Sequence, residues 1–102
     1  MSSWWPPADY VVRPRPGVTA VLARAERRVQ GDFQEILSIL ALNPYPNPQF
    51  PLITEDLADD GSRVFTYSDD YFPYAIHYVV FEPVDDESLI SVIDLTLLPR
   101  HS

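Results

Sequence analysis

The C-terminal half of the chain alternates between apolar runs and short acidic segments. Apolar runs occupy residues 63–68, 74–82 and 88–98, and acidic, proline-containing segments of about five residues separate them. Such segments are typical of hairpin connections between strands. We therefore predict an antiparallel β-meander over residues 52–98, whose first strand begins near Ile53.

The last run is the most hydrophobic segment of the chain. Its apolar positions divide between two faces: Leu89, Ile93, Leu95 and Leu97 on one, with Ile90 and Val92 on the other. A strand that is apolar on both faces is usually an interior strand, covered at least in part on each side. This run is predicted to organise the sheet.

Residues 18–41 show helical periodicity instead. Two apolar faces follow each other: Val18, Val21, Leu22, Ala25 and Val29, then Phe33, Ile36, Leu37, Leu40 and Ala41. Gly31 suits the position after a helix C-terminus, and Asp32 with Glu35 resembles a capping box at the start of the next helix. Asn43 and Pro44 should end that second helix. The pattern predicts an αα-hairpin that turns at Gly31, with one kinked helix as the alternative.

The remaining segments complete a single predicted domain over residues 1–102. Residues 8–42 hold a short strand and the helical hairpin, residues 43–51 a proline-rich extended connector, and residues 52–98 the meander. The predicted fold class is α+β, with the N-terminal αα-hairpin packed on one face of a small antiparallel β-sheet.

The negative net charge of the chain indicates which kinds of partner it can bind. The net charge is −8, and residues 55–102 hold eleven acidic residues against two arginines. Because attraction to phosphate supplies most non-specific nucleic-acid affinity, no binding to free nucleic acid is expected. An acidic surface suits solubility or a basic partner.

Several kinds of site are not expected from the sequence. The chain has no cysteine, and it shows no phosphate-binding loop, dinucleotide fingerprint or zinc pattern, so we expect no cofactor and no metal site. No apolar run approaches the roughly 20 residues of a membrane span, and no signal peptide is evident. A cytoplasmic protein without membrane contact is expected.

Four segments carry a resemblance to a known family. They are Leu42-Asn43-Pro44, Leu57 with Gly61-Ser62-Arg63-Val64-Phe65, Tyr74-Ala75-Ile76-His77-Tyr78-Val79-Val80, and Ile90-Ser91-Val92-Ile93-Asp94-Leu95 ending near Pro99-Arg100. In this order the chain resembles the RelE/ParE superfamily of type II toxins, also described as plasmid-stabilisation proteins. The resemblance implies a bacterial toxin-antitoxin system, an antitoxin partner, and gyrase or the ribosome as the target.

The resemblance implies two activities. RelE-like members cut messenger RNA on the ribosome, whereas ParE-like members inhibit gyrase and are not nucleases. Here Ala75 stands where the family commonly has arginine, and the predicted sheet is acidic. These departures favour a toxin or toxin homologue that acts through protein–protein contact. The alternatives are a ribosome-dependent endoribonuclease and a non-toxic interaction module.

The endoribonuclease alternative needs a base, an acid and a cation near the phosphate. The candidate catalytic residues are Arg63, Arg100 and His101. Arg100 and His101 follow the last strand, where the resembling nucleases often place catalytic residues; a frayed tail is the other interpretation. His77 is interpreted as a half-buried structural residue.

The candidate partner-binding residues lie in the N-terminal half. They are Trp4, Trp5, Arg24, Arg27 and Arg28. Tryptophan is favoured as an interface anchor, and the arginines suit an acidic partner segment. The alternatives are tryptophans folded against the core edge and arginines on a solvated helix face. A second copy of the chain, forming a homodimer, is the alternative partner.

Overall fold

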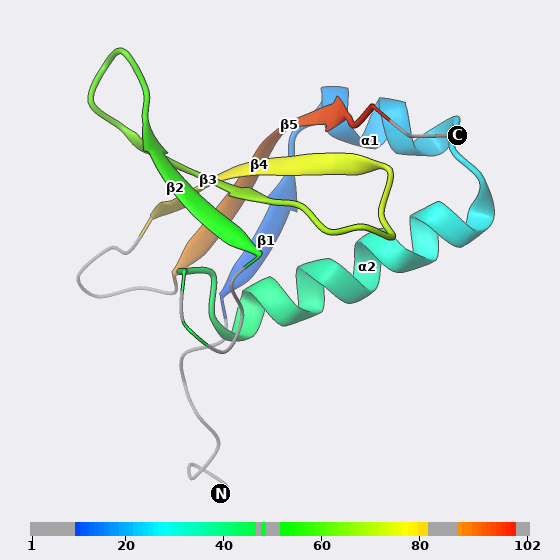
Figure 1. Ribbon diagram of the computed structural model, residues 1–102, viewed down its shortest axis with the longest axis horizontal. Helices are drawn as coiled ribbons and strands as arrows, with labels where there is room; N and C mark the ends of the chain where they lie inside the picture. The colour runs from blue at the N-terminus through cyan, green and yellow to red at the C-terminus, as the bar shows by residue number, and fades with distance from the viewer. Residues whose placement is uncertain (1–9, 47, 49–51, 82–87, 100–102) are drawn as a thin grey trace, which may run out of the picture.

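The computed structural model describes residues 10–46, 48, 52–81 and 88–99. It has an α+β fold with two helices and a five-stranded mixed sheet (Figure 1). In chain order the elements are β1 (Val11–Pro14), α1 (Pro16–Ala23), α2 (Arg27–Leu42), β2 (Ile53–Leu57), β3 (Arg63–Tyr67), β4 (Tyr74–Phe81) and β5 (Leu89–Leu97). Within these residues, neither helix has the length and apolar character that crossing a bilayer requires.

The sheet has the strand order β1-β5-β4-β3-β2. Strands β2 to β5 pair antiparallel in sequence order, which confirms the predicted meander. The prediction of a wholly antiparallel sheet is wrong, because β1 pairs in parallel with β5. In sequence, the two helices and strands β2 to β4 lie between β1 and β5. In the sheet, β1 and β5 are nevertheless neighbours. At this edge Pro14 can end β1 without interrupting a ladder.

Strand β5 is interior, as predicted, but its innermost residues are not those of the larger apolar face. Ile90 and Val92 are fully buried, whereas Leu97 is 65% exposed. Tyr78 pairs with Val92 and His77 with Asp94, so Ile93 is the extra residue of a β-bulge. The bulge reverses the alternation, which brings Leu95 opposite Ile76 on the core side of the sheet.

The break between the helices lies at residues 24–26, and the prediction of a turn at Gly31 is wrong. Helix α2 runs through Gly31, and Asp32 and Glu35 lie inside it rather than at its start. The side-chain amide of Gln30 donates to the carbonyl oxygens of Leu22 (2.9 Å) and Ala25 (3.2 Å). These bonds satisfy carbonyls at the end of α1, so the helix can stop there without a glycine. The predicted end of α2 before Asn43-Pro44 is confirmed.

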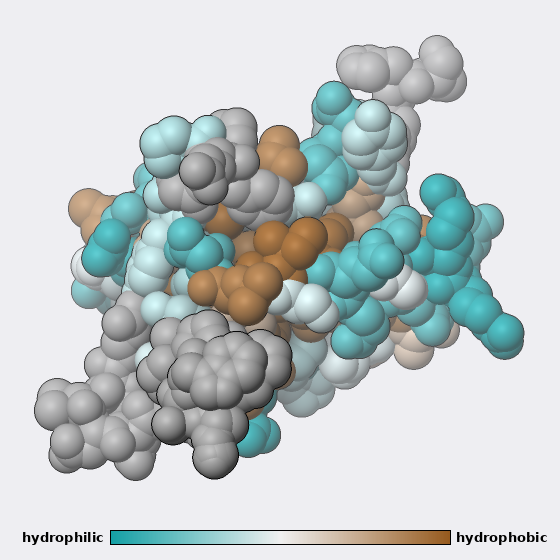
Figure 2. Space-filling view, turned by 90° about the horizontal axis from the view of Figure 1, so that it is seen from below, coloured by the Kyte–Doolittle hydropathy of each residue, from teal (hydrophilic) through white to brown (hydrophobic). Residues whose placement is uncertain are grey.

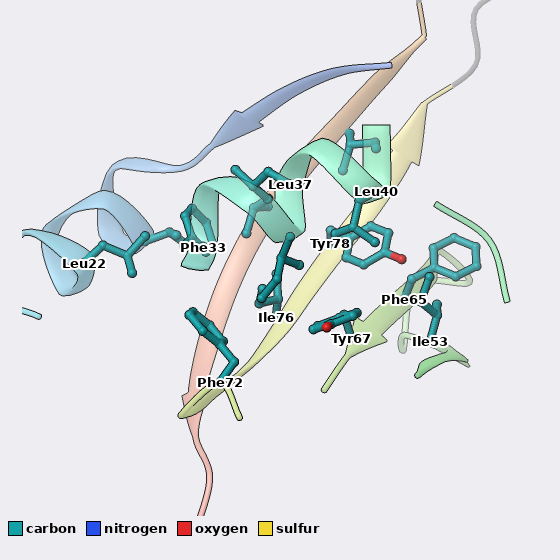
Figure 3. Packing of buried hydrophobic residues seen from close by; sticks show 14 of the residues in the cluster. Leu22, Phe33, Leu37, Leu40, Ile53, Phe65, Tyr67, Phe72, Ile76 and Tyr78 are labelled. Atoms are coloured by element: carbon teal, nitrogen blue, oxygen red, sulfur yellow. The ribbon is translucent and has the colours of Figure 1, made fainter. Parts of the chain in front are cut away.

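Both helices contribute to one core on one face of the sheet. Figure 3 shows Phe33, Leu37 and Leu40 of α2 directed toward Ile76 and Tyr78 of β4. The Phe33 ring stacks on Phe72, with centroids 6.2 Å apart. At the other end of the core, the Tyr78 hydroxyl donates to the buried carbonyl oxygen of Pro44. This bond attaches the start of the proline-rich connector to the middle of the sheet.

Candidate functional site

Three of the predicted partner-binding residues gather where the two helices meet. Arg24 follows the last residue of α1, and Arg27 and Arg28 are the first two residues of α2. All three side chains are exposed. We call this group the arginine corner. Trp4 and Trp5 lie outside the described residues.

A hollow adjoins the arginine corner. Its volume is about 490 Å³, and Ala20, Val21, Arg24 and Tyr74 line it. Val21 is 38% exposed, and the Tyr74 ring lies 5.9 Å from the Phe72 ring, which holds it beside the core. The hollow therefore offers one guanidinium next to an apolar wall, an arrangement suited to a partner residue that is partly apolar and ends in a carboxylate.

Helix stability does not explain Arg27 and Arg28. The positive end of the helix dipole lies at the N-terminus, where acidic residues stabilise and basic residues destabilise by about 0.3–1 kcal/mol each. The first turn of α2 itself contains no acidic residue, and the side chain of the N-cap residue Glu26, although acidic, forms no capping hydrogen bond. Residues that lower the stability of their own helix, with no contact that offsets the loss, are often retained for a function. The arrangement therefore favours the interpretation of this corner as a binding surface over that of a solvated helix face.

The candidate catalytic residue Arg63 is engaged within the sheet. It forms an ion pair with Glu55 across β2 and β3, and its guanidinium carbon lies 5.5 Å from the centre of the Phe65 ring. The hydrogen bond from Arg63 holds the pKa of the Glu55 carboxyl below its usual value. Arg100 and His101 lie outside the described residues. Of the three candidate catalytic residues, Arg63 is the one that the structure describes.

His77 lies on the sheet face opposite the helices. Its Nδ1 is 3.0 Å from the Thr66 hydroxyl oxygen, and its Nε2 is 2.8 Å from that of Thr96. The imidazole thus links β3, β4 and β5, and it is half-buried. Both ring nitrogens have hydroxyl partners, which supports the structural interpretation of His77. The sequence did not reveal these partners, because the bulge at Ile93 determines which β5 residue His77 reaches.

The Arg63–Glu55 pair predicts a pH dependence. The folded pKa of Glu55 is lowered, so the pair stabilises the fold above the unfolded carboxyl pKa, and this stabilisation is lost as the pH falls through the lower folded value. We expect Arg63→Gln to unfold at a lower temperature than the wild type at pH 7, with the difference shrinking toward pH 3. Thermal unfolding followed by circular dichroism measures this. A difference that stays constant across the range would contradict the pairing.

Comparisons of the chain with models of protein families, with curated proteins and with solved structures find no match. The resemblance to RelE/ParE toxins therefore stays a prediction from the sequence.

Proposed function

We propose that this protein acts by binding another protein, as a RelE/ParE-like toxin or toxin homologue held by an antitoxin. The element order supports the proposal: a strand, two helices and an antiparallel meander follow each other as in the resembling family. The arginine corner carries it, because Arg27 and Arg28 at the start of α2 oppose the helix dipole and Arg24, at the end of α1, lines a hollow.

The antitoxin segment is proposed to place a carboxylate on Arg24 and an apolar side chain in the adjoining hollow. Apolar anchors supply most of the affinity of such contacts, while charges set orientation and association rate. A non-toxic interaction module would use the same surface. RNA cleavage receives less support, because Glu55 and Phe65 already engage Arg63.

Charge reversal at Arg27 should have opposite effects on stability and on binding. Arg27→Glu places a carboxylate in the first turn of α2, so we expect the free energy of unfolding to rise by about 0.3–1 kcal/mol. Affinity for the antitoxin should fall, because the new charge repels its carboxylates. Urea unfolding measures the first effect and isothermal titration calorimetry the second.

Arg13→Glu is the matched control, because it changes the net charge equally and Arg13 lies exposed on β1, outside the described lining of the hollow. The control should leave affinity for the antitoxin within about twofold of wild type, as expected for a charge at the edge of or outside an interface. Equal losses of affinity in both variants would show that overall charge, rather than the corner, governs binding.

A growth experiment tests the toxin assignment itself. The chain is expressed in a bacterial host from an inducible promoter, with and without the product of the reading frame that adjoins its gene. The proposal expects arrested growth in the first case and restored growth in the second. Unaffected growth, together with no binding between the two products, would contradict it.

A further inference from the structure

A second hollow lies between α2 and the segment that joins β3 to β4. Its volume is about 230 Å³. The described residues that line it are Asp32, Glu35, Ile36, Ile39, Tyr67, Asp69, Tyr71 and Phe72. We call it the α2 groove. It is separate from the hollow beside Arg24, since the two share none of the lining residues that the structure describes.

The α2 groove has an apolar floor and an apolar rim. Ile36 and Phe72 are buried and form the floor, whereas Ile39 is 43% exposed and Tyr71 is 85% exposed. Figure 2 views the molecule from the side on which α2 lies and shows hydrophobic surface gathered near the middle of this face. Exposed apolar side chains beside a hollow provide the contact area that anchors a partner.

The charged residues among the described lining of the groove are all acidic. Asp32 and Glu35 lie three residues apart on one side of α2, and Asp69 lies in the segment between β3 and β4. Asp69 is held in place: its Oδ1 accepts the backbone N–H groups of Tyr71 and Phe72, each at 2.7 Å, and the Tyr67 hydroxyl donates to its Oδ2. No basic residue is among the lining residues that the structure describes, and none of the described cations forms an ion pair with Asp32 or Glu35.

From this complementarity we infer that the α2 groove is the docking site for a basic segment of a partner protein, one that presents an arginine beside an apolar residue. The inference rests on the proposed function, in that the chain acts by binding proteins, and it assigns a second surface for a partner other than the antitoxin. Arginine fits better than lysine, because its planar guanidinium can bond carboxylates from two elements and stack on the exposed ring of Tyr71. The apolar neighbour would cover Ile39.

The probe for this inference is a synthetic peptide in which leucine and arginine alternate, titrated into the isotope-labelled full chain. We expect amide shift changes to concentrate at residues 32–39 and 67–72. Glu35→Gln should weaken binding about tenfold, as expected when one charge-assisted hydrogen bond is lost. A peptide with citrulline in place of arginine, which keeps the shape without the charge, should lose comparable affinity.

Gln34→Lys is the matched control, because it also raises the net charge by one and Gln34 is exposed on α2, outside the groove lining that the structure describes and not three or four residues from Asp32 or Glu35. It should bind the arginine peptide within about twofold of the wild type. The inference is overturned if both variants weaken binding equally, if the shift changes spread over the acidic surface, or if the peptide does not bind. It is also overturned if the wild type self-associates in sedimentation and Glu35→Gln abolishes this, because the occupant is then a second copy.

Antitoxin binding, measured in parallel, separates this inference from the proposed function. If Glu35→Gln and the wild type bind the antitoxin equally while the peptide fails to bind, the groove inference fails and the proposed function stands. If the peptide binds as expected but no antitoxin does, the proposed toxin function fails and the groove remains a binding surface.

Discussion

Phe33→Ala is expected to lower the free energy of unfolding by about 3–5 kcal/mol, the usual cost of removing a large buried aromatic side chain. Phe33 is only 1% exposed and stacks on Phe72, and Figure 3 shows it at the end of the core nearer Leu22 of α1. The Phe33 ring therefore connects the helical layer to the sheet. Its removal leaves a cavity, and α2 cannot move inward to fill it because both ends of the helix are packed in place. A loss of this size is a large fraction of the stability of an average small domain.

Urea unfolding monitored by circular dichroism gives this value. Leu42→Ala provides the control on the same helix, because Leu42 is 69% exposed and its truncation should change the free energy by no more than about 0.5 kcal/mol. Similar losses in both variants would mean that α2 does not pack on the sheet through the face that carries Phe33.

Tyr78→Phe is expected to cost about 1–3 kcal/mol, because it removes the hydroxyl and leaves the buried carbonyl of Pro44 without its donor. The ring itself should remain in place, stacked on Phe65 with centroids 5.7 Å apart. The cost therefore reports the hydrogen bond rather than the packing. A substitution that leaves stability unchanged would show that the connector is not attached to the sheet through Tyr78.

The same variant should alter the response to alkaline pH. Burial raises the pKa of Tyr78 above its usual value, so the folded state holds the phenolic proton more tightly than the unfolded state does. The resulting stabilisation is complete below the unfolded tyrosine pKa of about 10 and is lost as the pH rises above it. Between pH 9 and pH 11 the wild type should lose more stability than Tyr78→Phe. Tyr67, whose pKa is raised by burial and by Asp69, contributes in the same direction, so Tyr67→Phe is measured beside it.

The sequence predicted the meander well because its signals are local. The runs at 63–68, 74–82 and 88–98 became β3, β4 and β5 with ends shifted by one residue. The parallel pairing of β1 with β5 depends on contacts across most of the chain, which no local pattern encodes. The prediction of a turn at Gly31 was wrong for a different reason. A glycine and a capping box are weak preferences, and the amide of Gln30 provides the cap for α1 instead.

The candidate site was predictable in part. Arg24, Arg27 and Arg28 were identified from their spacing, but the hollow beside Arg24 also requires Tyr74 from β4. The α2 groove likewise joins Glu35 to Asp69, which lies more than 30 residues later in the sequence. Such combinations appear only once the helices are placed on the sheet. Arg63 was selected as a cation, but its partner Glu55 follows from the β2–β3 register.

The most direct test of protein binding at the arginine corner is calorimetric titration of the adjoining gene product into the wild type, Arg24→Glu and Arg13→Glu. Arg24→Glu should weaken binding at least about tenfold, because it reverses the one charge among the lining residues that the structure describes. Arg13→Glu should match the wild type within about twofold. Binding that is equally tight in all three chains, or absent from the wild type, would contradict the account.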